Sequence, residues 1–311
     1  MPSMNLGPGA EFDLIRQLRD RWGELAPQIG DDAAVLRPPR GEQIVISTDT
    51  AIEKIHFRRD WLATQEIGYR AVTAALSDLA AMAANPLGVL VAIETNASDE
   101  LMELGDGIAD AVRAVGTVIL GGNLSRGADL SITTTVVGSA FTPLGRQGAR
   151  PGDLLYVTGA LGGPNAATRA FAKKKKPGAE LRDRFARPSA RIAEARWLAT
   201  RGAVAAIDIS DGLSADAVHL AAASNVGLEI QIDRIPVFEG ATRDDALAGG
   251  EEYELLLAAR APFPEEEFAE HFGGRIPLTP IGRAVDGEPH VNFSLNGKRV
   301  AAPKGYDHFS R

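Results

Sequence analysis

The stretch Gln65–Glu94, QEIGYRAVTAALSDLAAMAANPLGVLVAIE, decides the fold of the first half of the chain. Its first part, Gln65–Ala84, carries alanine and leucine at helical spacing, which predicts a helix. Asn85 and Pro86 end that helix, because the residue before a proline disfavours helical geometry. The following LGVLVAIE, Leu87–Glu94, has the apolar composition of a strand. A helix followed directly by a strand is therefore expected at the core of this half.

The same stretch is also the most apolar part of the chain. Ala71–Ile93 reaches the length of a membrane-spanning helix. Polar residues and a proline interrupt it, namely Ser77, Asp78, Asn85 and Pro86. We therefore expect a buried helix and strand, and no membrane partner.

Shorter patterns on both sides of this stretch predict further elements. They are strands at Gln43–Thr50, Thr117–Leu120 and Asp129–Phe141 and a helix at Leu101–Val115. This half is α+β. Residues 142–153, TPLGRQGARPGD, concentrate proline, glycine and arginine, as a junction between domains does. We predict two domains, 1–142 and 143–311.

The second half begins with LLYVTGALGG, a strand that runs into a glycine-rich turn. Further elements are expected as strands at Ala205–Ser210, Leu228–Ile232 and Tyr253–Ala258 and a helix at Leu213–Ser224. Four consecutive lysines at Lys173–Lys176 precede a Pro-Gly pair. A solvated loop is the simplest interpretation of this run, and phosphate binding is the alternative.

The composition excludes several classes of protein. The 311 residues contain 33 Lys and Arg against 41 Asp and Glu, a formal net charge of −8, so nucleic acid is not expected as a partner. The absence of cysteine excludes disulfides, thiolate zinc sites, iron–sulfur clusters and a cysteine nucleophile. Neither a P-loop nor the dinucleotide-binding glycine motif is present. The N-terminus lacks the pattern of a secretory signal, so we expect a cytoplasmic protein.

Acidic residues beside small or apolar residues are the clearest chemical signal. Asp78 shares a helix face with Ala71, Ala75 and Met82, where an unpaired carboxylate would cost several kcal/mol. Either an arginine such as Arg70 or a divalent cation has to offset that charge.

Two other acidic positions could bind a metal ion or cap a local structure. Asp49 follows the strand QIVIS, so its side chain is expected at a strand end with the hydroxyls of Ser47 and Thr48, as a ligand or as a cap. Asp208 and Asp211 bracket Ser210 at a strand-to-helix turn, where either a helix N-cap or a pair of ligands is possible. Oxygen ligands without cysteine suit Mg²⁺, Mn²⁺ or Ca²⁺, and Mg²⁺ commonly binds carboxylates together with substrate phosphates.

Glycines that follow strands permit close approach of the backbone to phosphates. Gly121–Asn123 and Thr158–Gly163 both have this form, and each is a weak signal alone. Candidate phosphate contacts are Arg126, Arg146 and Arg150, with surface ion pairs as the alternative. His56 lies just beyond Asp49, where packing or a capping contact is as compatible with the sequence as a role as base.

Seven segments, in order along the chain, resemble the thiamine-monophosphate kinases. They are IGDDAAVL, STDTAIEKIHF, IGYRAVTAALSDLAAMAANP, GGNLSRG, GARPGDLLYVTGALG, IDISDGLSAD and GGEEYEL. The resemblance runs from EFDLI near the start to GYDHF at the end. The same superfamily contains aminoimidazole ribonucleotide synthetase, selenophosphate synthetase and the hydrogenase maturation dehydratase.

The resemblance implies both an architecture and an activity. The N-terminal α+β domain would pair through its sheet with a second copy in a homodimer, and the C-terminal domain would be α/β, of the aminoimidazole ribonucleotide synthetase type. ATP and several Mg²⁺ would be held between the domains. The reaction would be in-line transfer of the γ-phosphate of ATP to thiamine monophosphate, whose phosphate oxygen is already anionic and needs no strong general base.

The resemblance also assigns roles to residues. The metal-binding positions would be Asp31, Ser47, Thr48, Asp49, Asp78, Asn123, Asp208 and Asp211. The nucleotide contacts would be Gly122, Asn123, Arg146 and Ser210, and the contacts to thiamine phosphate His56, Glu251 and Tyr306. Asp78, Arg146 and Asp208 would contribute to catalysis by organising and neutralising charge.

The chain departs from the family's pattern at two positions. Asn123 stands where the family more often has Asp, which removes one charge from a Mg²⁺ site. Glu252 stands where the family has the Asp of GGEDYEL, which adds a methylene beside the acceptor site. Two alternatives stay open: a paralogue that uses ATP to activate another phosphorylated or carbonyl acceptor, and a nucleotide-binding protein with impaired catalysis.

Overall fold

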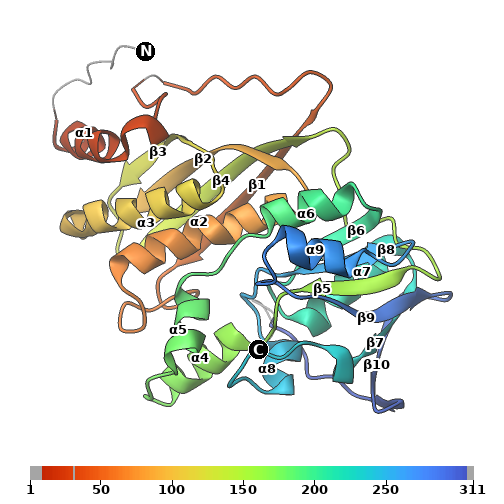
Figure 1. Cartoon of the computed structure of the whole chain (residues 1–311). Helices are drawn as coiled ribbons and strands as arrows, with labels where there is room; N and C mark the ends of the chain where they lie inside the picture. Colours follow the sequence, from red (N-terminus) through yellow and green to blue (C-terminus); the bar gives the residue numbers. More distant parts are fainter. Residues whose placement is uncertain (1–8, 31, 307–311) are drawn as a thin grey trace. The chain divides into compact units, whose positions relative to one another are not determined.

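The computed structural model describes residues 9–30 and 32–306, and it divides into two compact units (Figure 1). The N-terminal unit comprises Met1–Leu79 and Ala84–Pro143, and the C-terminal unit comprises Ala80–Ala83 and Leu144–Arg311. Each unit has its own sheet.

The N-terminal unit is built on a four-stranded sheet with the strand order β1-β4-β2-β3. Its strands are β1 (Gln43–Ile52), β2 (Asn85–Glu94), β3 (Ile119–Ser125) and β4 (Ser131–Ala140). β4 pairs antiparallel with β1 and β2, and β2 pairs parallel with β3. The two edges of the sheet are therefore β1 and β3.

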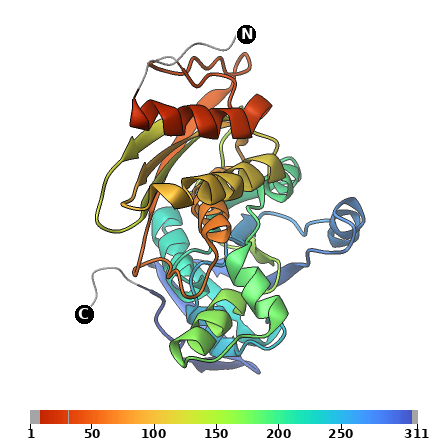
Figure 2. The same cartoon turned by 90° about the vertical axis from the view of Figure 1, so that its left-hand side faces the viewer.

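Helices α2 (Thr64–Ala81) and α3 (Leu101–Ala114) cover one face of this sheet (Figure 1). They cross in close contact, because a Cβ added to Gly107 would lie 1.8 Å from the carbonyl oxygen of Gln65. Helix α1 (Ala10–Trp22) packs against α3, and the indole N–H of Trp22 donates to the carbonyl of Gly105 at 2.8 Å (Figure 2). The helix predicted at Gln65–Ala84 is thus confirmed.

The C-terminal unit contains a seven-stranded sheet with the order β11-β10-β7-β9-β5-β8-β6. Its strands are β5 (Leu154–Thr158), β6 (Ala203–Asp208), β7 (Gly227–Gln231), β8 (Leu255–Ala259), β9 (Leu278–Val285), β10 (His290–Leu295) and β11 (Lys298–Val300). Only the β10–β7 pair is parallel among the strands described, so the sheet is mixed and mainly antiparallel.

In the described part of this unit, six α-helices accompany the sheet. They are α4 (Gly163–Ala172), α5 (Ala179–Ala186), α6 (Ile192–Ala199), α7 (Leu213–Ser224), α8 (Arg243–Ala248) and α9 (Glu265–His271). Short 3-10 helices lie at Gly23–Leu25, Ser98–Glu100 and Ile232–Arg234. Apolar residues of α7, including Leu213 and Leu220, pack with Leu228 and Ile281 of the sheet in one buried core.

Among the described residues, no helix is long and apolar enough to cross a membrane. The apolar stretch at Ala71–Ile93 is divided between α2 and β2, as its polar residues predicted. Its valines are buried, as are Leu76 and Leu79, whereas Leu87 and Leu90 are half-buried.

Candidate active site

In the N-terminal unit, α2 places Asp78 against β1. The hydroxyl of Ser47 donates a hydrogen bond to Oδ2 of Asp78. Asp49 lies two residues along the same strand and is therefore on the same face. It is exposed, and its Oδ1 accepts the N–H of Thr50 at 2.8 Å. One face of β1 thus presents the Asp49 carboxylate and the Ser47 hydroxyl, and α2 adds the carboxylate of Asp78.

Thr48 does not join this group through its side chain. Its Oγ1 lies 3.1 Å from Oγ1 of Thr135 and 3.4 Å from the carbonyl of Thr134, on the opposite face of the sheet. The expectation that these residues lie at a strand end is wrong, because β1 continues to Ile52. Side chains inside a strand alternate between faces, which separates Thr48 from Ser47 and Asp49.

Gly122 and Asn123 lie within β3, whereas the sequence predicted that they follow a strand. The cross-strand row Asp49–Thr134–Val91–Gly122 places them three strands from Asp49, about 14 Å at the usual spacing. One copy of the chain therefore does not bring Asn123 beside Asp49.

A cavity of about 270 Å³ lies next to Gly122 and Asn123. Its walls are mainly apolar, from α1, β2 and β3, and Asp32 is part of the lining. Asp31 lies outside the described residues.

His56 lies in the loop after β1, and its ring has a defined hydrogen bond. Nδ1 accepts the backbone N–H of Ile52 at 3.1 Å. A neutral imidazole that accepts at Nδ1 carries its proton on Nε2. The loop itself is anchored by Arg59, which pairs with Glu53 at 3.1 Å and with Glu100. His56 can thus donate from Nε2 to an anion.

In the C-terminal unit, β6 ends at Asp208 and α7 begins at Leu213. The N-cap of α7 is Gly212, with no side-chain capping bond, so neither Ser210 nor Asp211 is the cap that the sequence left open. Instead, Oδ2 of Asp216 accepts the N–H of both Ser210 and Asp211, each at 3.1 Å.

Asp216 is a residue of the turn that sequence reasoning missed. Its side chain is 2% exposed. Burial, followed by the charges of Asp208 and Asp211, raises the pKa of Asp216 to about 8. The only signal in the sequence was its place at the end of the segment IDISDGLSAD. Three carboxyl groups therefore meet at one strand-to-helix turn.

The same turn collects two residues predicted to bind the acceptor. The N–H of Glu251 donates to the carbonyl of Ser210 at 2.7 Å, and the N–H of Tyr306 donates to the carbonyl of Asp211 at 2.9 Å. Glu251 has a φ of 63°, a left-handed conformation uncommon for this residue type. The turn thus brings Ser210, Asp211, Glu251 and Tyr306 together.

An open cavity of about 1000 Å³ adjoins this turn. Asp211 and Tyr306 line it, with apolar side chains of α7, β10 and the C-terminal segment, among them Val218, Phe293 and Val300. A ligand with flat apolar rings and a charge would fit such a lining.

The glycine-rich turn Thr158–Gly163 surrounds protein carboxylates, not an empty anion site. Thr158 Oγ1 donates to Glu254 at 2.7 Å, and the N–H of Gly162 donates to Glu252 at 2.5 Å. A Cβ on Gly159 would lie 2.2 Å from Oε1 of Glu254. Glycine is needed here because Glu254 approaches the backbone, so the interpretation as a phosphate cradle is not supported.

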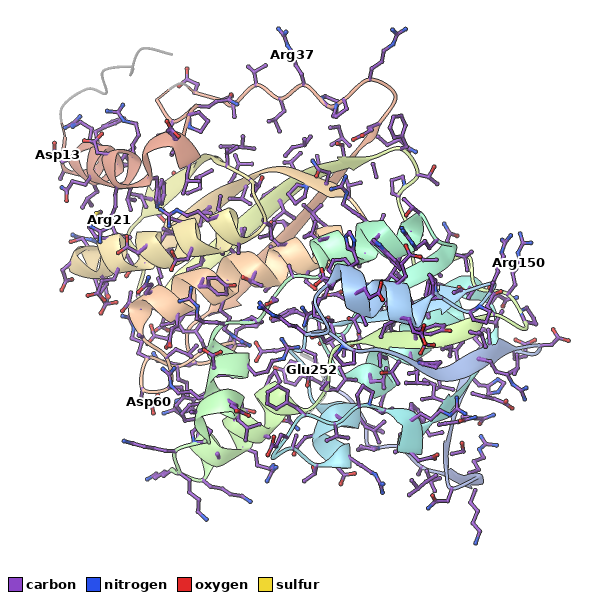
Figure 3. The ribbon with its side chains drawn as sticks, in the orientation of Figure 1. Asp13, Arg21, Arg37, Asp60, Arg150 and Glu252 are labelled. Atoms are coloured by element: carbon purple, nitrogen blue, oxygen red, sulfur yellow. The ribbon has the colours of Figure 1, made fainter. Side chains whose placement is uncertain are left out.

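Two arginines complete this buried cluster, of which Glu252 is labelled in Figure 3. Arg184 lies 2.7 Å and Arg191 2.5 Å from Oε1 of Glu254. Although burial raises it, the charges of Arg191 and Arg184 bring the pKa of Glu254 below its ordinary value. Burial raises the pKa of Glu252 to about 8, against the opposing charge of Arg184. Glu254 therefore forms a structural ion cluster with Arg184 and Arg191, and the Glu252 carboxyl beside it keeps its proton up to about pH 8.

Among the predicted cationic contacts, Arg146 is exposed, and its carbonyl accepts the Ser224 hydroxyl at 2.8 Å. Its guanidinium makes no ion pair within the described part of the chain. Arg150 reaches the surface (Figure 3). Lys173–Lys176 are exposed after α4, as the solvated-loop interpretation predicts.

The donor chemistry fits magnesium. The gathered side chains offer carboxylate and hydroxyl oxygens: Ser47, Asp49 and Asp78 in the N-terminal unit, and Asp208 and Asp211 in the C-terminal unit. Within residues 9–30 and 32–306, no group of three or more His, Cys, Asp and Glu side chains is arranged to hold a metal ion by itself. The fit therefore requires further oxygen ligands, such as those of phosphates.

Comparison with known proteins agrees with this division of the chain. Residues 30–140 match the family described as AIR synthase related protein, N-terminal domain, and residues 150–292 match its C-terminal domain. The thiamine-monophosphate kinase of Escherichia coli (strain K12) is 34% identical, over 96% of this chain and 98% of that protein. This chain belongs to the thiamine-monophosphate kinase family.

Solved structures of the thiamine-monophosphate kinase family have the same fold. The crystal structure of the enzyme from Stenotrophomonas maltophilia K279a has a TM-score of 0.81 and 32% identity, and covers 94% of this chain and 98% of that chain. The structure described as AaThiL complexed with AMPPCP and TMP has a TM-score of 0.75 and 29% identity, and covers 99% of this chain and 100% of that chain. The resemblance of the seven segments to this family is thereby confirmed.

Proposed function

We propose that this chain catalyses the Mg²⁺-dependent transfer of the γ-phosphoryl group of ATP to thiamine monophosphate, which yields thiamine diphosphate and ADP. Membership of the family along nearly the whole chain supports this function. The observation that carries it is the turn after β6, which collects the predicted metal ligand Asp211, the nucleotide contact Ser210 and the acceptor contacts Glu251 and Tyr306.

Two sets of oxygen ligands are proposed for magnesium, one on β1 and α2 and one at the turn after β6. The residues proposed for it are Asp31, Ser47, Thr48, Asp49, Asp78, Asn123, Asp208 and Asp211. Because the hydroxyl of Thr48 is bonded to β4, its contribution would come from its backbone carbonyl. Bound Mg²⁺ would neutralise phosphate charge and orient the γ-phosphate for in-line attack.

For the nucleotide, we propose contacts from Gly122, Asn123, Ser210 and Arg146. The apolar cavity beside Gly122 and Asn123 suits the face of a purine ring. The Arg146 guanidinium is free of ion pairs in the described residues and so is available for phosphate oxygens.

For the acceptor, the Nε2–H of His56 would donate to the phosphate of thiamine monophosphate. The Glu251 carboxylate and the Tyr306 ring suit the thiazolium cation and the aminopyrimidine. An anionic oxygen of the acceptor phosphate attacks the γ-phosphorus as the bond to the β-phosphate oxygen breaks, so no residue has to remove a proton. Arg146 would neutralise phosphate charge, and Asp78 and Asp208 would position the magnesium. We place this ATP-dependent activity in the cytoplasm.

We also propose that the protein is a homodimer joined through the N-terminal sheet. Ile44 and Ile46 on the outer face of β1 are 42% and 64% exposed. A second copy covering this face would bury them. Because β1 is an edge strand, that copy could also reach past the edge to the carboxylates on the other face and supply there the Asn123 that one copy leaves about 14 Å away.

Mixing two inactive variants tests the dimer. Asp49→Asn and Asn123→Ala are each expected to lose activity, and unfolding and refolding them together should restore about a quarter of wild-type activity if each site takes one residue from each copy. No recovery from a mixture that sedimentation shows to be dimeric would reject sharing of the site. A wild-type protein that sediments as a monomer would reject the dimer itself.

The activity is tested with a panel of acceptors. ATP consumption and product are followed with thiamine monophosphate, thiamine and aminoimidazole ribonucleotide precursors as separate acceptors. Thiamine diphosphate formed only from thiamine monophosphate is expected. Turnover with another acceptor only would favour a paralogue, and tight ATP binding without turnover, before and after Asn123→Asp, would favour the impaired protein.

A further inference from the structure

The proposed reaction gives no role to the buried carboxyl group of Asp216. Asp216 lies in the first turn of α7 and is 2% exposed. It accepts the N–H groups of Ser210 and Asp211, both at 3.1 Å from Oδ2. Within the described part of the chain, Asp216 has no arginine or lysine partner. A carboxyl group buried in this way has a cost that a role should explain.

The backbone carbonyl groups of Ser210 and Asp211 also accept hydrogen bonds. The carbonyl of Ser210 accepts from Glu251 at 2.7 Å, and the carbonyl of Asp211 accepts from Tyr306 at 2.9 Å. Neither Ser210 nor Asp211 belongs to a strand or helix, so no regular ladder satisfies these groups. Among the residues described, Asp216 is the one side chain that accepts hydrogen bonds from the backbone N–H groups of Ser210 and Asp211.

We propose that Asp216 is a positioning residue, whose carboxyl group fixes the backbone of Ser210 and Asp211 and thereby sets both the metal ligands and the acceptor contacts. This inference rests on the proposed function. The side chain of Asp211 leaves the chain at the fixed peptide, and Asp208 lies close enough to Asp216 for their charges to interact. Glu251 and Tyr306 are hydrogen bonded to the same two residues. Movement of this turn would therefore disturb magnesium binding and acceptor binding together.

The experiment compares Asp216→Ala with Asp216→Asn. The asparagine keeps one acceptor oxygen at nearly the same place, whereas the alanine leaves two buried N–H groups without a partner. For Asp216→Ala we expect the apparent KM for Mg²⁺ and that for thiamine monophosphate each to rise about tenfold or more, with Asp216→Asn staying within about threefold of wild type.

A second readout does not depend on turnover. Hydrogen exchange of the peptide containing residues 207–216, measured by mass spectrometry without ligands, should be faster by about tenfold in Asp216→Ala and close to wild type in Asp216→Asn. Binding of Mn²⁺ with a non-hydrolysable ATP analogue, followed by electron paramagnetic resonance, should weaken in the alanine variant only.

Asp153→Ala is the matched control. Asp153 is 5% exposed in the same unit and accepts one backbone N–H, from Arg150 at 2.7 Å, in a turn before β5. Removal of the Asp153 carboxyl group should lower thermal stability without changing the KM for Mg²⁺ or the KM for thiamine monophosphate. If Asp216→Ala instead behaves like this control, the role is only structural.

The remaining outcomes are also decisive. Equal loss in Asp216→Asn and Asp216→Ala would show that the charge matters and not the hydrogen bonds, which overturns the proposal. If Asp216→Ala does not fold, wild-type exchange and wild-type Mn²⁺ binding in Asp216→Asn support the proposal, and faster exchange there overturns it. If the wild type itself makes no thiamine diphosphate, the proposed function fails. The hydrogen-exchange and Mn²⁺-binding measurements still test whether Asp216 fixes the backbone of Ser210 and Asp211.

Discussion

Two sets of buried carboxylates in the C-terminal unit are held in different ways. Glu254 is held by the guanidinium groups of Arg184 and Arg191, and by the hydroxyl of Thr158. Asp216 is held only by backbone N–H groups in the described residues. The pKa of Glu254 is lowered although burial raises it, because of Arg191 and Arg184, whereas burial and neighbouring acids raise the pKa of Asp216.

This difference distinguishes carboxylates that stabilise the fold from carboxylates that belong to the candidate active site. An acid neutralised by buried arginines within the protein has no charge left for a ligand, and the glycine-rich turn around Glu254 serves that pairing. The turn after β6 gathers acids without an arginine partner for Asp216, and it is where the predicted metal, nucleotide and acceptor residues meet. A cation from outside is expected there.

The largest effects should come from removing charge at the proposed metal ligands. Asp78→Asn and Asp208→Asn are each expected to lower Mg²⁺-dependent turnover by more than ~100-fold, because the metal's charge stabilisation is worth several kcal/mol. Steady-state kinetics measure the loss, and circular dichroism should show an unchanged fold. Near-native turnover in either variant would contradict its assignment.

The ion cluster should respond in stability. Glu254→Gln removes the carboxylate nearest to two buried guanidinium groups and is expected to lower the free energy of unfolding by about 3–5 kcal/mol. Urea denaturation measures this change. The control is Glu267→Gln, which removes an exposed ion pair with Arg201 and should cost at most ~1 kcal/mol. Equal costs in the two variants would show that the cluster is not structural.

A smaller effect should appear in the pH dependence of stability. The pKa of Glu252 is about 8 in the folded protein and ordinarily 4.5, so within this range the folded state holds a proton that the unfolded state releases. Its contribution to the free energy of unfolding is therefore present below pH 5 and is lost as the pH rises through about 8.

Glu252→Gln keeps the acceptor for Gly162 and removes this titration. Between about pH 5 and 8, its free energy of unfolding should fall by about 2–4 kcal/mol less than that of the wild type. Denaturation at several pH values checks the difference, with the exposed Glu266→Gln as control. The same slope in Glu252→Gln and the wild type would mean that Glu252 is already ionised.

The smallest effect is expected at the lysine run. Replacing Lys173–Lys176 by glutamine should change turnover less than about twofold, because these side chains are exposed in the loop after α4. A strong rise in the KM for ATP would instead support the phosphate-binding alternative. Initial rates at varied ATP decide between the two.

Local patterns predicted the elements that depend on nearby residues. Helix α7 has the predicted bounds, Leu213–Ser224, and α2 differs by a few residues at its ends. β3 was predicted too short, because glycines at 121 and 122 were interpreted as a turn. β9 was not predicted, since Pro280 interrupts its pattern, and the structure accommodates it where the pairing with β5 shifts register.

The candidate site was predictable only in part, because some of its contacts join residues that are distant in the sequence. The spacing of Asp208, Ser210 and Asp211 pointed to a turn that gathers oxygen ligands. The role of Asp216 depends on the path of the backbone through that turn, and the neutralisation of Glu254 depends on Arg184 and Arg191, far away in sequence. Such long-range pairing leaves no local pattern.

The fate of the γ-phosphate tests the account most directly. The protein is incubated with Mg²⁺, thiamine monophosphate and ATP labelled at the γ-phosphorus, and the products are separated. ADP and thiamine diphosphate are expected in equal amounts, with the label in the terminal phosphate of thiamine diphosphate. Label found only in inorganic phosphate, or ATP left unconsumed by folded protein, would contradict it.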